Sequence, residues 1–146
     1  MQRRKFLKNC ALGCAGMLAG SSLLPACAGV TYIAATPSEE GLEIPLSAFE
    51  IPHKKGMRYR SVVVLTHSRL QYPIAVFRSP DSGYRALWMK CTHQGTELNA
   101  YSGRLQCPAH GSEFDTKGKV LNGPAEAGLR SFPVHLKDDR LSIQLT

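Results

Sequence analysis

Cysteine is scarce in this chain, and most of it lies near the N-terminal end. Of the five cysteines in 146 residues, Cys10, Cys14 and Cys27 fall within the first 27 positions. Cys91 and Cys107 are the two that remain for the rest of the chain. A small fold held together by several disulfides is therefore excluded. What the two remaining thiols do depends on the residues beside them.

Sequence features that identify many enzymes are also absent. There is no phosphate-binding glycine loop and no paired nucleophile and base. Beyond the N-terminal stretch, no segment shows the 3.6-residue hydrophobic period of a convincing helix. We therefore expect a protein that is not an enzyme on its own and that is built from β-strands.

Strong charge is missing from the body of the chain. The formal net charge is +7, but four of the basic residues lie within positions 3–8. Without them, 14 basic residues face 11 acidic ones, which leaves +3. This excess is too small to indicate a nucleic-acid partner. The one basic cluster, residues 53–60, is typical of a solvated loop, with contact to lipid head groups or to an acidic partner as the alternatives.

The N-terminal residues resemble an export signal. Residues 2–8, QRRKFLK, match the twin-arginine signature, except that Gln2 stands where Ser or Thr is usual. The next stretch, as far as Ser38, is uncharged, weakly hydrophobic and rich in Ala and Gly. Twin-arginine export carries folded proteins. A protein that receives its cofactor in the cytoplasm needs such a route, because it must cross the membrane already folded. We expect the rest of the chain to work on the periplasmic side of the cytoplasmic membrane.

Three outcomes after export are open. Residues 24–27, LPAC, are similar to a lipobox, in which Cys27 is acylated and becomes the mature N-terminus. The alternatives are an uncleaved membrane anchor, for which the uncharged run is long enough, and a freely soluble protein. We expect a signal over residues 1–27, a tether over 28–41 and a folded domain over 42–146.

Two cysteines and two histidines form matched pairs in the folded part. Cys91-Thr-His93 is followed, after thirteen residues, by Cys107-Pro-Ala-His110. Such pairs fit a 2Fe-2S cluster in which two thiolates hold one iron and two imidazoles hold the other. Structural zinc sites favour other spacings, so a zinc-stabilised binding module is the alternative. If both thiols are ligands, the domain has no cysteine left for a disulfide.

The ligand types determine the net charge of such a cluster. Two neutral imidazoles leave the oxidised centre neutral, whereas four thiolates would make it doubly negative. A neutral centre accepts an electron more easily, which accounts for potentials of about −150 to +300 mV in clusters of this kind. The second imidazole nitrogen can release a proton on oxidation, so we expect the potential to fall as pH rises.

The residues around the two pairs predict loops. Gly95, Gly103, Pro108 and Gly111 interrupt any helical period. Small residues at these positions allow backbone amides to approach the sulfurs and to stabilise the reduced cluster. A third loop around Pro124, in the stretch NGPA at 122–125, is placed to close over the site.

The remaining pattern is all-β, with antiparallel sheets that form a base and a small cluster-binding subdomain at about residues 89–125. Short runs rich in β-branched and aromatic residues alternate with turn residues. A proline confines the first of these runs to a sheet edge, and the second is apolar enough to be buried on both faces. The main strands are expected at 42–46, 61–66, 73–78, 84–90, 131–136 and 140–145.

These motifs together resemble the Rieske iron–sulfur protein family over roughly residues 42–146. The matching elements are CTHxG, CPxHGSxFD, GPA at 123–125 and LRSFPV at 129–134. The resemblance implies a Rieske fold with cysteine on the buried iron and histidine on the exposed one. It also implies that Ser112 donates a hydrogen bond to a bridging sulfide. The ligands that it implies are Cys91, His93, Cys107 and His110.

The sequence departs from the quinol-oxidising members in two respects. Thr96 and Ala109 stand where those proteins have a pair of cysteines that joins the two loops by a disulfide. Phe114 stands where they have a tyrosine whose hydroxyl bonds a ligand thiolate. One hydroxyl donor fewer leaves the more negative reduced state less stabilised. We therefore predict a reduction potential below that of the quinol-oxidising proteins.

The length of the domain restricts its function. A mononuclear iron oxygenase would need a second domain, and the Rieske fold already occupies about all of residues 42–146. We expect a one-electron carrier with redox partner proteins, as an anchored subunit of a chain that runs from a quinol to a cytochrome. The alternative is the small subunit of a periplasmic molybdenum oxidoreductase of the arsenite oxidase kind. Partner docking is expected at an uncharged tip that includes Gln94, Ala109, Pro124 and Ala125.

Overall fold

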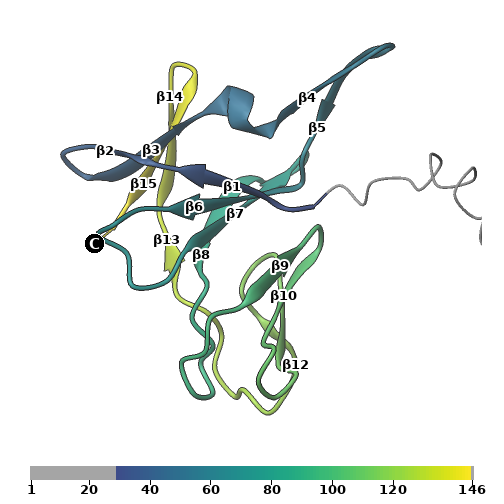
Figure 1. Cartoon of the computed structure of the whole chain (residues 1–146), viewed down its shortest axis with the longest axis vertical. Coiled ribbons are helices and arrows are strands. Elements are labelled where there is room, and N and C mark those ends of the chain that lie inside the picture. Colours follow the sequence, from purple (N-terminus) through teal and green to yellow (C-terminus); the bar gives the residue numbers. More distant parts are fainter. Residues whose placement is uncertain (1–28, 146) are drawn as a thin grey trace, which may run out of the picture.

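The computed structural model describes residues 29–145, and the predicted all-β fold is confirmed (Figure 1). Within these residues the one helix is a single 3-10 turn, η2 (Leu46–Phe49), which the sequence pattern did not predict. The strands are β1 (Thr31–Ala34), β2 (Thr36–Pro37), β3 (Gly41–Pro45), β4 (Glu50–His53), β5 (Gly56–Tyr59), β6 (Val62–Thr66), β7 (Ile74–Ser79), β8 (Gly83–Trp88), β9 (Asn99–Tyr101), β10 (Arg104–Gln106), β11 (Glu113–Asp115), β12 (Val120–Asn122), β13 (Ser131–Phe132), β14 (Val134–Lys137) and β15 (Arg140–Gln144).

The strands form three sheets and a separate hairpin. The base consists of a five-stranded sheet in the order β1-β6-β7-β8-β13 and a four-stranded sheet in the order β14-β15-β3-β2. A smaller sheet, β12-β11-β10-β9, lies below the base in the view of Figure 1. The hairpin of β4 and β5 projects from the opposite end of the molecule. The small sheet falls within the segment that we expected to form the cluster-binding subdomain.

Strands β6 and β7 are buried on both faces, as predicted for the β-branched run at 61–66. Because side chains alternate along a strand, these strands contribute to two separate cores. Val62, Val64 and Phe77 pack toward the small sheet, in the same cluster as Cys91 and Cys107. Their neighbours in sequence pack toward β3 and β15 on the other face. The five-stranded sheet is therefore a shared wall between the site and the rest of the base.

Part of the stretch predicted as a tether belongs to the base instead. From Thr31 onward β1 pairs with β6 in parallel, with Thr31 opposite Val63 and Ala34 opposite Thr66. Ala35 is buried, and Ile33 packs against the core. A parallel pair between segments about thirty residues apart is a non-local contact, which the polar composition of residues 28–41 did not reveal. Residues 31–37 are therefore part of the base sheets.

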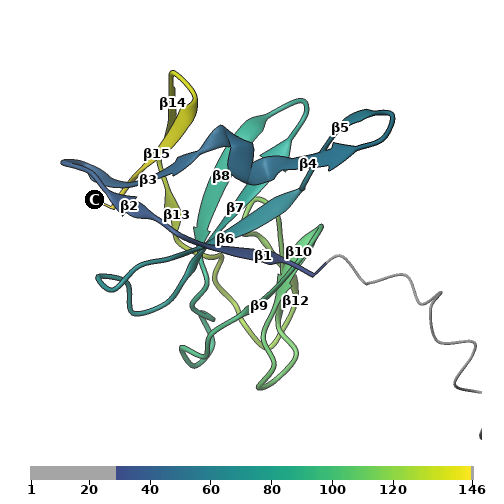
Figure 2. The same ribbon diagram turned by 45° about the horizontal axis from the view of Figure 1, so that its top comes forward.

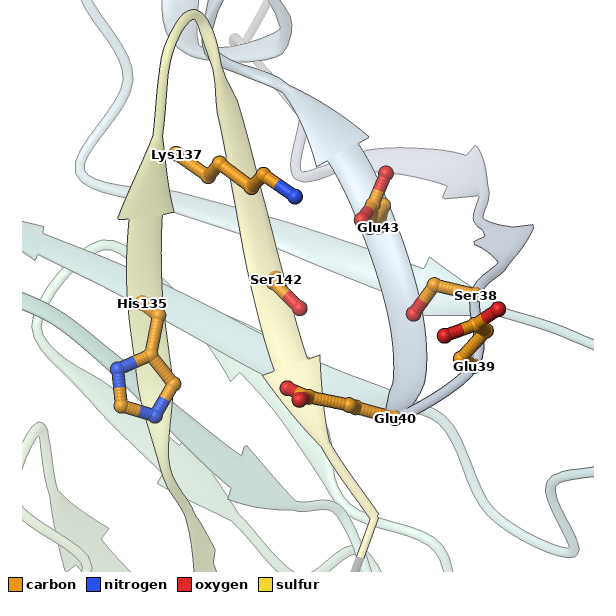
Figure 3. Close-up of a pocket in the computed structure, with 7 residues that line it drawn as sticks. All are labelled: Ser38, Glu39, Glu40, Glu43, His135, Lys137 and Ser142. Atoms are coloured by element: carbon orange, nitrogen blue, oxygen red, sulfur yellow. The ribbon is translucent and has the colours of Figure 1, made fainter.

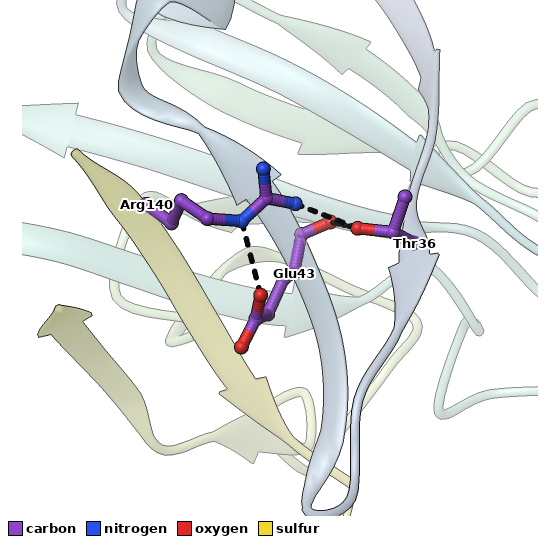
Figure 4. Close-up of polar contacts among 3 residues, drawn as sticks. All are labelled: Thr36, Glu43 and Arg140. Carbon is purple, nitrogen blue, oxygen red and sulfur yellow. Dashed lines mark hydrogen bonds and ion pairs between the residues drawn. The ribbon is translucent and has the colours of Figure 1, made fainter. Parts of the chain in front are cut away.

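Strand β2 also ties this stretch to the second sheet (Figure 4). Arg140 donates one hydrogen bond to Glu43 at 3.0 Å and another to the Thr36 hydroxyl at 2.7 Å. These contacts join β15, β3 and β2. Strand β3 consequently has a neighbour on each side, and the edge position predicted for it is wrong except near Pro45, beyond the two residues that β2 covers.

The export and anchoring predictions concern other residues. The twin-arginine motif at 2–8 and Cys27 lie outside the described residues. Between Gly29 and Leu145, no helix is long and apolar enough to cross a membrane.

Candidate metal centre

The first cysteine–histidine pair lies on a tight loop between β8 and β9. The Cys91 amide donates to the Thr96 carbonyl at 2.8 Å, and the Gly95 amide donates to the Cys91 carbonyl at 2.8 Å. The loop therefore folds back on itself around Cys91, with His93 at its outer bend. A bridge between Lys90 and Glu97 closes the base of this loop.

The second pair lies on a loop of the same design between β10 and β11. The Cys107 amide donates to the Ser112 carbonyl at 2.8 Å, and the Gly111 amide donates to the Cys107 carbonyl at 3.0 Å. In each loop a glycine four residues after the cysteine returns the chain to the cysteine carbonyl. The two ligand loops, residues 91–96 and 107–112, are thus structural equivalents despite their different cysteine-to-histidine spacing.

The two loop glycines adopt backbone angles that other residues avoid. Gly95 has φ +73° and Gly111 has φ +79°. A side chain in this left-handed region costs about 1–2 kcal/mol. A Cβ on Gly95 would also lie 3.2 Å from Cε of Lys90, whereas a Cβ on Gly111 would meet nothing within 4 Å. A substitution at Gly111 therefore tests the effect of the backbone angle alone, without a steric clash.

We expect Gly111→Ala to lower the thermal midpoint of the domain by about 5–10 °C, because the loop must hold a strained backbone angle. Thermal unfolding followed by circular dichroism measures the change. Gly103→Ala is the matched control, since it lies in the β9–β10 turn without a positive φ and a Cβ there has free space. An equal loss of stability in both variants would contradict this explanation.

The two loops separate sulfur from nitrogen. Cys91 and Cys107 are each 2% exposed and share a core with Leu105 and Phe114. His93 and His110 are exposed, and their ring centroids lie 5.0 Å apart at an interplanar angle of 85°. The pattern places a pair of thiols inside and a pair of imidazoles at the surface.

This arrangement fits a binuclear cluster better than a single ion. Within residues 29–145, no three Cys, His, Asp or Glu side chains converge as ligands of one ion. A 2Fe-2S centre of the expected kind needs only two protein ligands for each iron. The donors present, two sulfurs at one end and two nitrogens at the other, match that requirement.

The environment of Cys107 favours its thiolate. Burial raises the pKa of the thiol, but hydrogen bonds from the Ala109 and His110 amides lower it, as do contacts with the side chains of Cys91 and Thr96. The net effect is a pKa below the usual value for cysteine. Because the thiolate is the form that binds metal, the second loop is arranged to hold a cation.

The third loop closes over the site through Ser112, as its composition predicted. Ser112 is fully buried, and its hydroxyl accepts a hydrogen bond from the Ala125 amide at 3.0 Å. Since the oxygen accepts this bond, the hydroxyl proton is available to another acceptor. The same loop is tied to the first ligand loop, where the Thr92 hydroxyl donates to the Ala127 carbonyl at 2.6 Å. Pro124 is exposed, but Ala125 is 5% exposed and does not contribute to the outer surface as expected.

A cationic cleft lies beside the first ligand loop. It has a volume of about 690 Å³ and includes Cys91 and His93 in its lining. The indole ring of Trp88 has Lys90 Nζ at 5.1 Å and Arg130 Cζ at 5.9 Å from its centroid. Neither cation takes part in a salt bridge among the described residues. The cleft therefore presents two positive charges next to the exposed end of the site.

The comparison with known families decides the nature of the site. The family model described as the Rieske [2Fe-2S] domain matches residues 48–133, which is more than half of the chain. The chain belongs to the Rieske family. Its cofactor is accordingly a Rieske [2Fe-2S] cluster, and the protein is an iron–sulfur electron carrier. The predicted family, fold and cofactor are thus confirmed, and the zinc alternative is not.

Two curated relatives illustrate the range of proteins that contain this Rieske domain. The cytochrome b6-f complex iron-sulfur subunit of Synechococcus sp. strain RCC307 is 29% identical over 154 residues, which cover 98% of this chain and 84% of that protein. The oxygenase component of dicamba O-demethylase from Stenotrophomonas maltophilia is 38% identical over 79 residues. That match covers 47% of this chain and only 23% of the demethylase component, far less than two thirds of its length.

Solved structures support the same Rieske fold. The plasma membrane Rieske protein from Synechocystis PCC 6803 is 29% identical with a TM-score of 0.51, over 57% of this chain and 86% of that chain. A chain of a hyperthermophilic respiratory complex III has a TM-score of 0.53 over 94% of this chain and 95% of that chain. At 21% identity, the second likeness shows the fold alone.

The other histidines of the Rieske domain lie apart from the two pairs. The His53 and His67 rings each accept a hydrogen bond from a backbone amide two residues later. His135 lines a separate pocket of about 490 Å³ on the outer face of the second base sheet (Figure 3). Glu43 in that pocket is already bonded to Arg140. None of the three histidines was expected to be a ligand.

Sequence reasoning overlooked the cationic cleft. Lys90 immediately precedes Cys91, but Arg130 lies 40 positions further along the chain. Strand pairing brings them together, since the Trp88 amide donates to the Arg130 carbonyl at 2.9 Å. The sequence feature that could have indicated the cleft is the aromatic Trp88 and the cationic Lys90 shortly before Cys91.

Proposed function

We propose that this protein transfers single electrons through a [2Fe-2S] cluster held by the two loop cysteines on one iron and by the two loop histidines on the other. The assigned ligands are Cys91, His93, Cys107 and His110. The assignment rests on the orientation of the two loops, whose cysteine sulfurs are buried and whose histidine rings are exposed. An electron enters and leaves most easily at the exposed histidine end, where a partner can approach the metal closely.

The roles of the surrounding residues follow from their contacts. The hydrogen bonds from the Ala109 and His110 amides lower the pKa of the Cys107 thiol and so favour the thiolate that binds metal. The proton of the buried Ser112 hydroxyl is available for a sulfur acceptor, because the hydroxyl oxygen already accepts from Ala125. Gly95 and Gly111 allow the backbone of each loop to turn close to the cluster. The cluster supplies the one-electron redox change. The surrounding residues influence its reduction potential and keep water away from its cysteine sulfurs.

We also propose that the protein is exported by the twin-arginine route and anchored outside the cytoplasmic membrane by a lipid on Cys27. The sequence motifs at 2–8 and 24–27 support this assignment. The electron-transport setting is supported by the cytochrome b6-f subunit of Synechococcus, which aligns with nearly the whole chain. The partner we propose is therefore a cytochrome-containing membrane complex with a quinol as the electron source.

The test of this function begins with the purified full-length protein. We expect it to be reddish-brown, to lose visible absorption on mild reduction and to give a rhombic electron paramagnetic resonance signal of low average g. Affinity purification from the native membrane is expected to recover cytochrome b. Recovery of a molybdopterin subunit instead would replace the proposed partner, and a colourless protein that contains zinc would overturn the electron-transfer function.

The cationic cleft predicts how charge affects the exchange of electrons. We expect the double variant Lys90→Glu, Arg130→Glu to be oxidised by ferricyanide about tenfold more slowly at low salt, because the anion loses its attraction to the cleft. The difference should shrink as salt is added. Stopped-flow absorbance at the cluster band measures both rates.

The control for this prediction carries the same change in charge. Lys117→Glu, Lys119→Glu alters the exposed turn after β11, at the end of that strand away from the second ligand loop. A cationic cobalt oxidant tests the sign, since it should react faster with the cleft variant than with the wild type. Equal slowing in both double variants would mean that net charge, and not the cleft, controls the rate.

A further inference from the structure

The β4–β5 hairpin is an exposed projection that the electron-transfer site does not use. Its strands pair only with each other among the described residues, from Glu50 opposite Tyr59 to His53 opposite Gly56. Every residue of β5 is exposed. Met57 and Tyr59 are 47% and 50% exposed, which is high for large apolar side chains. Both views of the molecule show the hairpin standing away from the sheets (Figure 2).

The tip of this hairpin is strongly basic. Lys54 and Lys55 form the turn, and Arg58 follows on β5. Neither these residues nor any other side chain of the hairpin takes part in a salt bridge among residues 29–145. The one acidic residue of the hairpin, Glu50, lies at its base. Cations beside an exposed apolar side chain, here Met57, favour contact with an anionic membrane surface.

The base of the hairpin is held firmly, so the tip has a defined direction. Arg60 donates hydrogen bonds to the Ala48 and Glu50 carbonyls across the base. The guanidinium of Arg78, on β7, lies 4.2 Å from the centroid of the Tyr59 ring. These contacts connect the hairpin to the base sheet and to the turn before it.

The hairpin lies on the same flank as the start of the described chain. Gly29 and Val30 line a cleft of about 490 Å³ together with Ile51, Arg58 and Tyr59. Figures 1 and 2 both show the N-terminal end of β1 and the hairpin on one side of the molecule. Cys27 precedes Thr31 by four residues, which span at most about 14 Å when extended. A lipid on Cys27 would therefore place this flank at the surface of the bilayer.

We propose that the β4–β5 hairpin binds the anionic surface of the membrane and acts as a second attachment beside the N-terminal anchor. The ligand class is the anionic phospholipid head group, which Lys54, Lys55 and Arg58 attract, while Met57, nearer the tip, enters the interface. The position of the hairpin beside the anchor rests on the proposed lipidation, whereas its charge and exposure do not. A basic patch beside the anchor adds electrostatic attraction to anionic lipid and determines which flank of the domain faces the bilayer.

Amine footprinting of the intact protein tests the proposed contact. The full-length protein, loaded with its cluster, is mixed with vesicles of phosphatidylglycerol and phosphatidylcholine or with vesicles of phosphatidylcholine alone. We expect acetylation of Lys54 and Lys55 to slow at least about threefold on the anionic vesicles only, as peptide mass spectrometry measures, because the attraction depends on surface charge. Lys117 and Lys119 in the same molecule serve as controls and should label at unchanged rates. Unchanged labelling of the hairpin lysines on both vesicles would overturn the proposal.

Charge reversal provides the second test. The variant Lys54→Glu, Lys55→Glu, Arg58→Glu is expected to lose at least about tenfold in affinity for the anionic vesicles, measured by co-sedimentation. The variant Lys117→Glu, Lys119→Glu, Lys137→Glu carries the same charge change elsewhere and should bind nearly as the wild type does. Equal binding by the two variants, or protection of the hairpin by an acidic protein but not by lipid, would overturn the membrane assignment. An intact paramagnetic signal in each variant separates this result from a failure of the electron-transfer function.

Discussion

Replacing His110 with alanine is expected to abolish the cluster. Each iron has only two protein ligands in the proposed arrangement, so the variant would leave the exposed iron with His93 alone. No other histidine of the domain can replace the lost ligand, because His53, His67 and His135 lie elsewhere in the fold. The expected result is loss of colour and of the paramagnetic signal, with iron and acid-labile sulfide near zero per chain.

The matched control for this variant is His135→Ala. His135 lies on β14, is exposed and lines a pocket on the far sheet. Its removal should leave the iron content and the visible spectrum unchanged. If His110→Ala retained the wild-type spectrum while Cys107→Ala lost it, the two-iron assignment would fail at its nitrogen end.

Ser112→Ala is expected to lower the reduction potential by roughly 60–130 mV. The Ser112 hydroxyl is fully buried and accepts from the Ala125 amide, which leaves its proton for a sulfur of the cluster. Loss of a hydrogen bond to a charged group costs about 1.5–3 kcal/mol. One electron converts about 1.4 kcal/mol into 59 mV. Because the reduced cluster is more negative, it loses more stabilisation than the oxidised one, and the potential falls.

A redox titration followed by circular dichroism in the visible range measures this potential. Ser142→Ala is a suitable control, since Ser142 is a buried serine on β15 in the second base sheet. That change should leave the potential within experimental error. An unchanged potential in Ser112→Ala would show that its hydroxyl does not bond to sulfur.

Much of the candidate site was predictable because its signals are local. The spacing from Cys91 to His93 and from Cys107 to His110 lies within single loops, and the glycines at 95 and 111 mark turns that recur in the structure. The alternation of β-branched residues identified strands directly. The all-β class required no knowledge of how those strands pair.

What the sequence did not reveal depends on contacts between distant segments. The composition of residues 28–41 predicts a tether and does not indicate β1, because the partner strand of β1, β6, lies about thirty residues away. Ala125 was placed on the surface because nothing local shows that its amide bonds to the buried Ser112. The cationic cleft needs Arg130 beside Trp88, which follows from the approach of the segment after the third loop to the end of β8.

The pairing of β1 with β6 also limits how far the cluster can travel. From Thr31 to Ala34 the backbone is paired with β6 in the five-stranded sheet. Strand β1 therefore moves together with the sheet that separates the base from the two ligand loops. Lipidation of Cys27, as proposed above, would place the lipid four positions before β1 and so would confine the exposed histidines to a narrow range of distances from the bilayer.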